Sequence, residues 1–369
     1  MFSDLNRHFD KGIVLNGLTH AGIEARMLNF AQIPGAKILI KPLAGALNMH
    51  TYLRNKPAWM QLIIFGGLTG GILFLVFTLG ISIVARINHL SVIQITSMTP
   101  ADYARPELAG VIKGLLVVQF FGIFFIPPLV FAYLADPAPL AFAGIRPPQK
   151  RSFLLLGLLI MIAAYFTVEF LGTLNEFIVH LLPKITQQWV ESGESNANGT
   201  LENILNMKGP ADLLVTIFLV GALPAIGEEL FFRGILQKLF IQIFKSAWPG
   251  IIFTGFLFSA FHMQFMGFLP RMALGIILGT LYWYSGSLFT SMLGHFVFNT
   301  INILLIYFKF ADLDSKSPSG ILFSLVGVAS LALVVFLLNY LRKKSATTYA
   351  TEFPALTEFN SFEDPDHPA

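Results

Sequence analysis

Long runs of uncharged residues constrain this chain more than any other feature. A helix needs about 20 mostly apolar residues to cross a bilayer, and the first such run extends from Met60 to Ala85 without a single charge. The later runs cover about residues 110–135, 153–174, 211–238, 248–269, 272–285, 287–308 and 320–341. We therefore predict an all-α fold, a polytopic membrane helical bundle with about eight transmembrane helices. The glycines at residues 66–71 predict close helix packing by the first run.

Composition supports a membrane protein and excludes several other classes. Charged residues make up only 12% of the chain, whereas soluble domains carry about 25%. The net charge of +3, without a basic stripe that interleaves aromatic residues, argues against nucleic acid as a partner. The absence of cysteine excludes disulfides, thiolate catalysis and cysteine-based zinc sites, which leaves Glu, Asp and His as bases or metal ligands.

The chain divides into three parts by polarity. Residues 1–56 mix charged and apolar residues without the pattern of a signal peptide, so we expect a cytoplasmic or interfacial segment that stays in the mature protein. Residues 57–341 form the predicted transmembrane domain. Within it, the polar stretch 175–209 is predicted to be mainly a loop with some helix. Residues 342–369 are polar, become acidic toward the end, and are predicted to be disordered.

Basic residues predict the orientation in the membrane. Lys and Arg favour cytoplasmic loops, and basic residues occur at 54–56, 146–151, 238–245 and 342–344. With eight spans these four segments fall on one side. We expect a multi-pass protein of a bacterial cytoplasmic membrane, with both termini in the cytoplasm.

Ionisable residues within membrane spans are costly and therefore mark candidate functional positions. Glu169 lies alone in the third run. The others occur in three short sequences, GEELFFRG, FSAFH and HFVFN. In these, the positions of interest are Glu228, Glu229, Arg233, His262, His295 and Asn299.

The two adjacent glutamates are predicted to play different parts. Glu229 and Arg233 are four residues apart, so they share a helix face and can form a structural pair. Glu228 is rotated by about 100° from Glu229 around the helix axis. It therefore points in a different direction, and we expect it to face a cavity. Pro224 is expected to kink the helix one turn earlier.

Counting the helical rise places four polar side chains at a similar depth. At about 1.5 Å per residue, Glu228, His262, His295 and Asn299 lie about 12–20 Å from the cytoplasmic ends of their runs. Such a set suits hydrolysis, with a carboxylate as general base and imidazole or amide groups as donors to an oxyanion. A zinc ion bound by Glu228, His262 and His295 is an alternative. Purely structural roles, in packing or in a charge pair, are the other alternative.

The same sequences resemble the motifs of a known family. GEELFFRG resembles the EExxxR motif of the CPBP intramembrane proteases, which include type II CAAX prenyl endopeptidases and bacterial Abi-type proteins. FSAFH is similar to the family's FxxxH motif and HFVFN to its HxxxN motif, in the same order, and the resemblance covers about residues 150–310. The resemblance implies eight helices and a site that opens toward the cytoplasm. It implies that Glu228 activates a water, His262 positions it, His295 and Asn299 stabilise the oxyanion, and Glu229 and Arg233 support them.

The resulting hypothesis is an intramembrane endopeptidase, either a metalloprotease or a glutamate-dependent enzyme. Its substrate would be a peptide or protein in the bilayer, either a prenylated CAAX-type chain or another membrane peptide. A non-proteolytic scaffold or bacteriocin self-immunity protein of the same fold is the first alternative. A proton- or ion-coupled transporter ranks last, because such proteins are expected to contain inverted repeats and the sequence shows no repeat.

Overall fold

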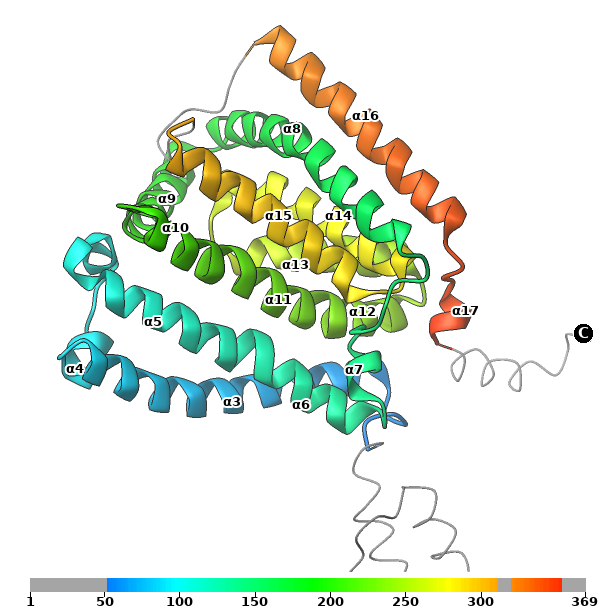
Figure 1. Ribbon diagram of the computed structural model, residues 1–369, viewed down its shortest axis with the longest axis horizontal. Coiled ribbons are helices and arrows are strands. Elements are labelled where there is room, and N and C mark those ends of the chain that lie inside the picture. The colour runs from blue at the N-terminus through cyan, green and yellow to red at the C-terminus, as the bar shows by residue number, and fades with distance from the viewer. Residues whose placement is uncertain (1–51, 311–319, 354–369) are drawn as a thin grey trace, which may run out of the picture. The chain divides into compact units, whose positions relative to one another are not determined.

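The computed structural model describes residues 52–310 and 320–353, and those from Leu53 onward belong to one unit (Figure 1). The N-terminal segment 1–51 lies outside the described residues. Within the described ranges every regular element is helical. The first half contains α3 (Ala58–Ile87), α4 (Val92–Thr96), η2 (Pro100–Ala104), η3 (Pro106–Leu108), α5 (Ala109–Gln119), η4 (Phe120–Phe125), α6 (Ile126–Ala135), α7 (Pro139–Phe142), α8 (Ser152–His180) and α9 (Lys184–Leu205). The second half contains α10 (Pro210–Thr216), η5 (Ile217–Ala222), α11 (Leu223–Glu228), η6 (Glu229–Leu236), α12 (Gln237–Phe244), α13 (Ala247–Phe261), η7 (Phe265–Gly267), α14 (Phe268–Ser285), α15 (Leu288–Tyr307), α16 (Ile321–Lys344) and α17 (Tyr349–Glu352).

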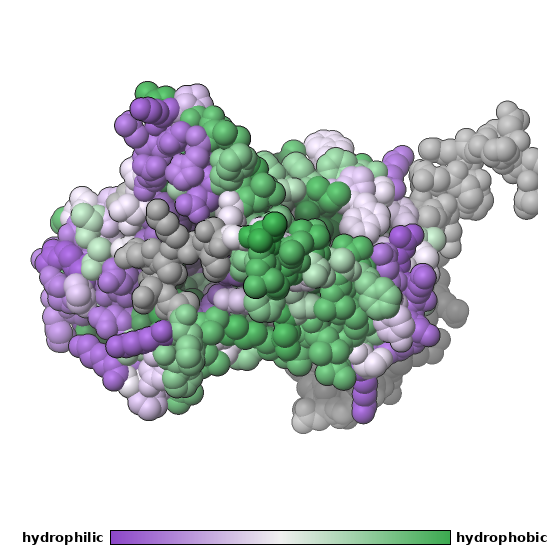
Figure 2. All heavy atoms as spheres, turned by 90° about the horizontal axis from the view of Figure 1, so that it is seen from above, coloured by the Kyte–Doolittle hydropathy of each residue, from purple (hydrophilic) through white to green (hydrophobic). Residues whose placement is uncertain are grey.

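These helices form a polytopic membrane bundle, as the sequence predicts. In the described part of the chain, 7 helical stretches are long and apolar enough to span a bilayer. The eighth, α13, has only 15 residues, or about 22 Å, so it is shorter than a hydrocarbon core of about 30 Å. On the face seen in Figure 2, hydrophobic residues cover the middle and hydrophilic residues gather toward both ends. This distribution is typical of a membrane-embedded surface.

Two of the spans change pitch immediately before a proline. The π-helical turn η4 ends where α6 begins, and Pro127 and Pro128 stand in the first positions of α6. The π-helical turn η5 likewise precedes α11, whose second residue is Pro224. Proline has no amide hydrogen and its ring crowds the carbonyl one turn earlier. The wider π-helical turn therefore accommodates the helix kink that the prolines predict at these positions.

The segment between the third and fourth spans is more helical than expected. The third span continues to His180, and α9 then forms 22 helical residues where the sequence favoured a loop. The polar composition of α9 hides its periodicity, because a helix that lies against protein on one face only needs few apolar residues. The Asn203 amide donates to the carbonyls of Tyr103 and Arg105 at 3.1 and 2.7 Å, which attaches α9 to the loop before α5.

The start of the predicted disordered tail is also ordered. Residues 342–344 extend α16, and Thr348 caps the short helix α17 by accepting from the Thr351 amide. Arg146 then holds α17 through an ion pair with Glu352 at 2.7 Å. Residues beyond 353 lie outside the described ranges.

The glycines of residues 66–71 do not provide the close helix packing that the sequence predicts for them. A Cβ added at any glycine of residues 66–71 would meet nothing within 4 Å. A Cβ at Gly275 of α14 would instead lie 2.9 Å from the Cα of Gly255 on α13. α13 and α14 are therefore packed closely against each other in the second half of the bundle.

Candidate active site

Four neighbouring helices carry the predicted site residues. Glu228 is the last residue of α11 and Glu229 the first of the π-helical segment η6, so a change of pitch separates the two carboxylates. α11 and η6 both contact α15, which carries His295, and η6 also contacts α13. In Figure 1, α13, α14 and α15 lie between α8 and α11, in agreement with the contacts between these elements.

Glu229 and Arg233 form the pair that their spacing predicts. Arg233 Nη1 donates to Glu229 Oε1 at 2.6 Å, and both side chains are completely buried. His295 Nδ1 donates to the same Glu229 oxygen at 3.0 Å. One carboxylate oxygen thus accepts from a guanidinium on its own helix and an imidazole on α15. The sequence does not predict this second contact.

Arg233 also links the pair to the other two helices. Its Nη2 donates to the Gly275 carbonyl of α14 at 3.1 Å. Its guanidinium carbon lies 4.6 Å from the centre of the Phe258 ring on α13. A desolvated cation is stabilised both by a carbonyl dipole and by an aromatic face. Arg233 is therefore the point at which η6, α13 and α14 are joined.

The His295 ring bridges the two glutamates. Because a carboxylate only accepts, Nδ1 carries the hydrogen that bonds Glu229. The opposite nitrogen, Nε2, lies 4.0 Å from Glu228 Oε2. The Glu228 side chain keeps 13% of its surface exposed, in contrast to the completely buried Glu229. The two carboxylates therefore differ in burial, since Glu229 is completely buried and Glu228 keeps part of its surface exposed.

His262 stands at the end of the short helix α13 rather than within a span. Its Nδ1 donates to the Phe258 carbonyl at 2.8 Å, because a carbonyl can only accept, and this leaves Nε2 available to another partner. The Phe258 ring lies 5.1 Å from the His262 ring and 5.9 Å from the His295 ring.

Phe258 is the shared apolar contact of three site residues, and reasoning about ionisable residues overlooks it. The signal that could have identified it is its position one helical turn before His262, at the start of FSAFH.

Asn299 and Glu169 are less closely connected to this group. Asn299 Nδ2 donates to the Val220 carbonyl of η5 at 3.3 Å, a long hydrogen bond to the preceding part of the fourth span. Asn299 lies one turn beyond His295 on α15, so both face that span. Glu169 is half-buried on α8, and the described residues provide no hydrogen bond from its carboxylate to Glu228, His262 or His295.

The donor types suit zinc, but their arrangement does not. A zinc ion needs three or more nitrogen or oxygen ligands at about 2.0–2.2 Å from one point. In the described part of the chain, no three His, Asp or Glu side chains are gathered closely enough to hold a metal ion. The Nδ1 atoms of His262 and His295 already donate to Phe258 and Glu229. Glu228, His262 and His295 therefore do not form a three-ligand site as they stand.

The comparisons with known proteins point to the same helices. Residues 210–301 match the family model described as type II CAAX prenyl endopeptidase Rce1-like. We call residues 210–301 the Rce1-like segment, after the family model to which they are similar. The Rce1-like segment begins with α10 and ends within α15, and it contains every predicted site residue from Glu228 to Asn299. The family match thus lies within the part of the chain that the motif resemblance covers.

The chain is also similar to a curated protein. The uncharacterized protein YpbD of Bacillus subtilis (strain 168) is 24% identical over 141 residues, which cover 37% of this chain and 68% of that protein. No solved structure matches the chain.

Proposed function

We propose that the Rce1-like segment is the active site of an intramembrane endopeptidase in which Glu228 activates a water. The observation that supports this most directly is the 4.0 Å separation between Glu228 Oε2 and His295 Nε2. This distance is too long for a direct hydrogen bond and allows one water to contact both atoms. A water in this position has a carboxylate beside it to take its proton.

In the proposed reaction Glu228 is the general base. It takes a proton from the water as the oxygen attacks the carbonyl carbon of the scissile peptide bond, and it returns the proton to the leaving amine. His262 positions the water through its free Nε2. His295 and Asn299 stabilise the oxyanion. The ring nitrogen of His295 that faces the reacting atoms is Nε2, because Nδ1 is bonded to Glu229.

Glu229 and Arg233 act as positioning residues in this scheme. They touch no reacting atom, but their buried hydrogen bonds hold the His295 ring at a fixed orientation. A ring displaced by 1 Å would lose the geometry that the reaction requires.

The substrate we propose is a peptide or protein in the bilayer. The family's description is a type II CAAX prenyl endopeptidase, and we include a prenylated CAAX-type chain as one member of the proposed class. Other membrane peptides are the second. The proposed reaction needs no metal ion. The zinc alternative is tested by measuring the zinc content of the purified protein. One zinc ion per chain that is lost in His262→Ala would overturn the metal-free scheme.

The decisive experiment compares the N- and C-termini of membrane proteins in cells that carry wild type or Glu228→Gln, which removes the base and keeps the shape. Glu169→Gln is the matched control, since it removes another carboxylate within a span but outside the site. We expect specific fragments to vanish in Glu228→Gln and to persist in Glu169→Gln at equal protein levels. If all three strains have the same termini, the endopeptidase proposal fails and a non-proteolytic scaffold or immunity role takes its place.

A further inference from the structure

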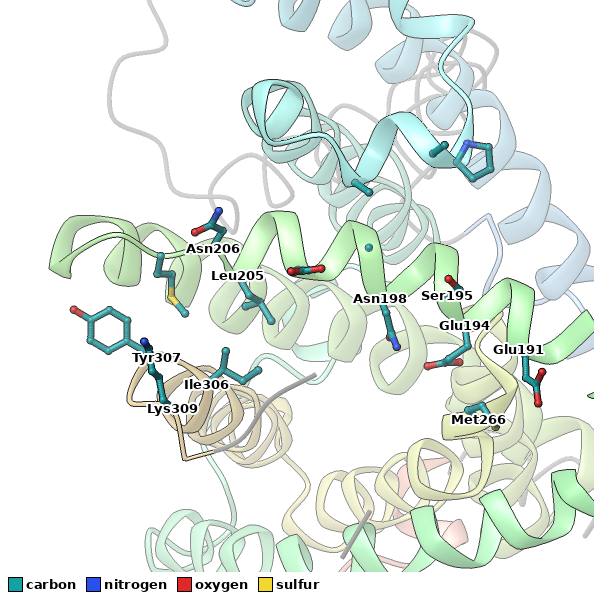
Figure 3. A pocket seen from close by; sticks show the side chains of 16 residues that line it. Glu191, Glu194, Ser195, Asn198, Leu205, Asn206, Met266, Ile306, Tyr307 and Lys309 are labelled. Atoms are coloured by element: carbon teal, nitrogen blue, oxygen red, sulfur yellow. The ribbon is translucent and has the colours of Figure 1, made fainter. Parts of the chain in front are cut away.

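A cavity of about 1320 Å³ lies beside α9, at the end of the bundle remote from α17 (Figures 1 and 3). One face of α9 forms its longest wall, and Figure 3 shows Glu191, Glu194 and Asn198 extending from this helix. Met266 of η7 and Ile306 of α15 belong to the other walls. Pockets for drug-sized ligands measure about 300–1,000 Å³, so this cavity is large enough for a peptide segment.

The walls of the cavity differ in chemistry. Glu191, Glu194 and Glu202 contribute three carboxylates, and Lys309 contributes a cation, among the described residues of the lining. Oxygen Oε2 of Glu194 is buried and has no hydrogen-bond partner among the described residues. Met266 and other apolar side chains stand elsewhere in the lining. A ligand that combines basic and apolar side chains would satisfy both kinds of wall.

A short connector joins this cavity to the candidate active site. Met266 belongs to the residues 263–267 that directly follow His262. Arg271 holds the connector by donating to the Gln264 carbonyl at 2.9 Å and to Gln264 Oε1 at 2.7 Å. Arg271 therefore fixes the connector on the side that follows His262 in the chain.

The distribution of basic residues indicates which side of the membrane the cavity faces. Lys150 donates to the Lys344 carbonyl, so the basic segments before α8 and after α16 meet at one end of the bundle. The cavity is formed at the opposite end, by α9, the residues of η2 and the last turn of α15. If the basic end is cytoplasmic, the cavity opens on the other side. This differs from the cytoplasmic opening that the family resemblance implies.

We propose that this cavity is the entry site for the substrate of the endopeptidase, and that it takes a lysine- or arginine-containing peptide segment from the non-cytoplasmic side. The inference rests on the proposed function. The α9 carboxylates bind the basic side chains, and the connector of residues 263–267 leads the chain past His262 toward Glu228.

Binding is measured on full-length protein that carries Glu228→Gln, so that cleavage plays no part. The probes are two fluorescein-labelled decapeptides that differ only in three positions, lysine in one and glutamate in the other. The cavity variant adds Glu191→Gln, Glu194→Gln and Glu202→Gln. The control variant instead adds Glu107→Gln, Glu176→Gln and Asp212→Asn, which remove the same charge at the same end of the bundle outside the cavity lining.

We expect the lysine peptide to bind more tightly than the glutamate peptide. The three substitutions of the cavity variant should raise the Kd of the lysine peptide by about tenfold. The control variant should bind as the parent does. Equal affinity of the lysine peptide for the cavity and control variants would overturn the inference. Binding that behaves as expected, together with unchanged protein termini in the Glu228→Gln comparison, would leave the cavity as a peptide site and reject the proposed function.

The side of entry is tested with single cysteines, because the natural chain has none. Ser195→Cys places a thiol on the exposed cavity face of α9, and Ala346→Cys places one beyond α16 at the opposite end. In intact cells a membrane-impermeant maleimide should label Ser195→Cys and should reach Ala346→Cys only after permeabilisation. The reverse pattern would show that the cavity opens to the cytoplasm and would overturn the proposed side of entry.

Discussion

Replacing Arg233 by methionine tests how the bundle tolerates its buried charges. Methionine retains most of the apolar stem but removes the hydrogen bonds to Glu229 and to the Gly275 carbonyl. Glu229 would then remain completely buried, with its hydrogen bond to His295 but without a cationic partner on its own helix. Removing one member of a buried ion pair typically costs about 3–5 kcal/mol, mostly because the other charge is left uncompensated. We expect Arg233→Met to lower the free energy of unfolding by this amount.

A double variant separates the cost of the isolated charge from the cost of lost packing. Glu229→Gln in the Arg233→Met background removes the uncompensated carboxylate, so the double variant should be more stable than Arg233→Met alone by about 1–3 kcal/mol. The measurement is reversible unfolding of the detergent-purified protein, with all variants compared under one set of conditions.

Arg105 provides the matched control. It forms ion pairs with Asp102 and Glu107, at 3.3 and 2.7 Å, but it lies at the surface with 54% of its side chain exposed. Solvent screens such pairs, so Arg105→Met should leave the unfolding midpoint unchanged. If Arg233→Met is no more destabilising than Arg105→Met, or if the double variant is less stable than Arg233→Met, the buried pair does not hold the site as we have argued.

Two further substitutions test the supports of the site. Gly275→Ala would place a Cβ 2.9 Å from the Gly255 Cα and should cost about 1–3 kcal/mol of unfolding free energy, whereas Gly70→Ala, which meets nothing within 4 Å, should be neutral or stabilising. A Gly275→Ala protein as stable as Gly70→Ala would contradict the close packing of α13 and α14. Asn175→Ala removes a buried side chain that donates to the carbonyls of Phe265 and Met266, so it should cost about 1–3 kcal/mol and make the connector more susceptible to proteolysis. Unchanged cleavage within residues 263–267 in limited proteolysis would refute this role.

The sequence by itself determined the class of fold and the pairing within one helix. Apolar runs without charge leave few alternatives to membrane helices, because an unpaired backbone group in lipid is too costly. The spacing of Glu229 and Arg233 sufficed to predict their ion pair, since residues four apart share a helix face whatever surrounds them. These features depend on local periodicity, which a single sequence contains.

The tertiary structure decided which groups meet across helices. Residues 229 and 295 are bonded at 3.0 Å, but no local pattern specifies which face of α15 packs against η6. Counting the helical rise also assumed regular helices, whereas the π-helical turns of the fourth span and the early end of α13 at Phe261 shift the register. The cavity beside α9 could not be predicted at all, because its walls come from segments far apart in the chain. Only the packed bundle brings them together.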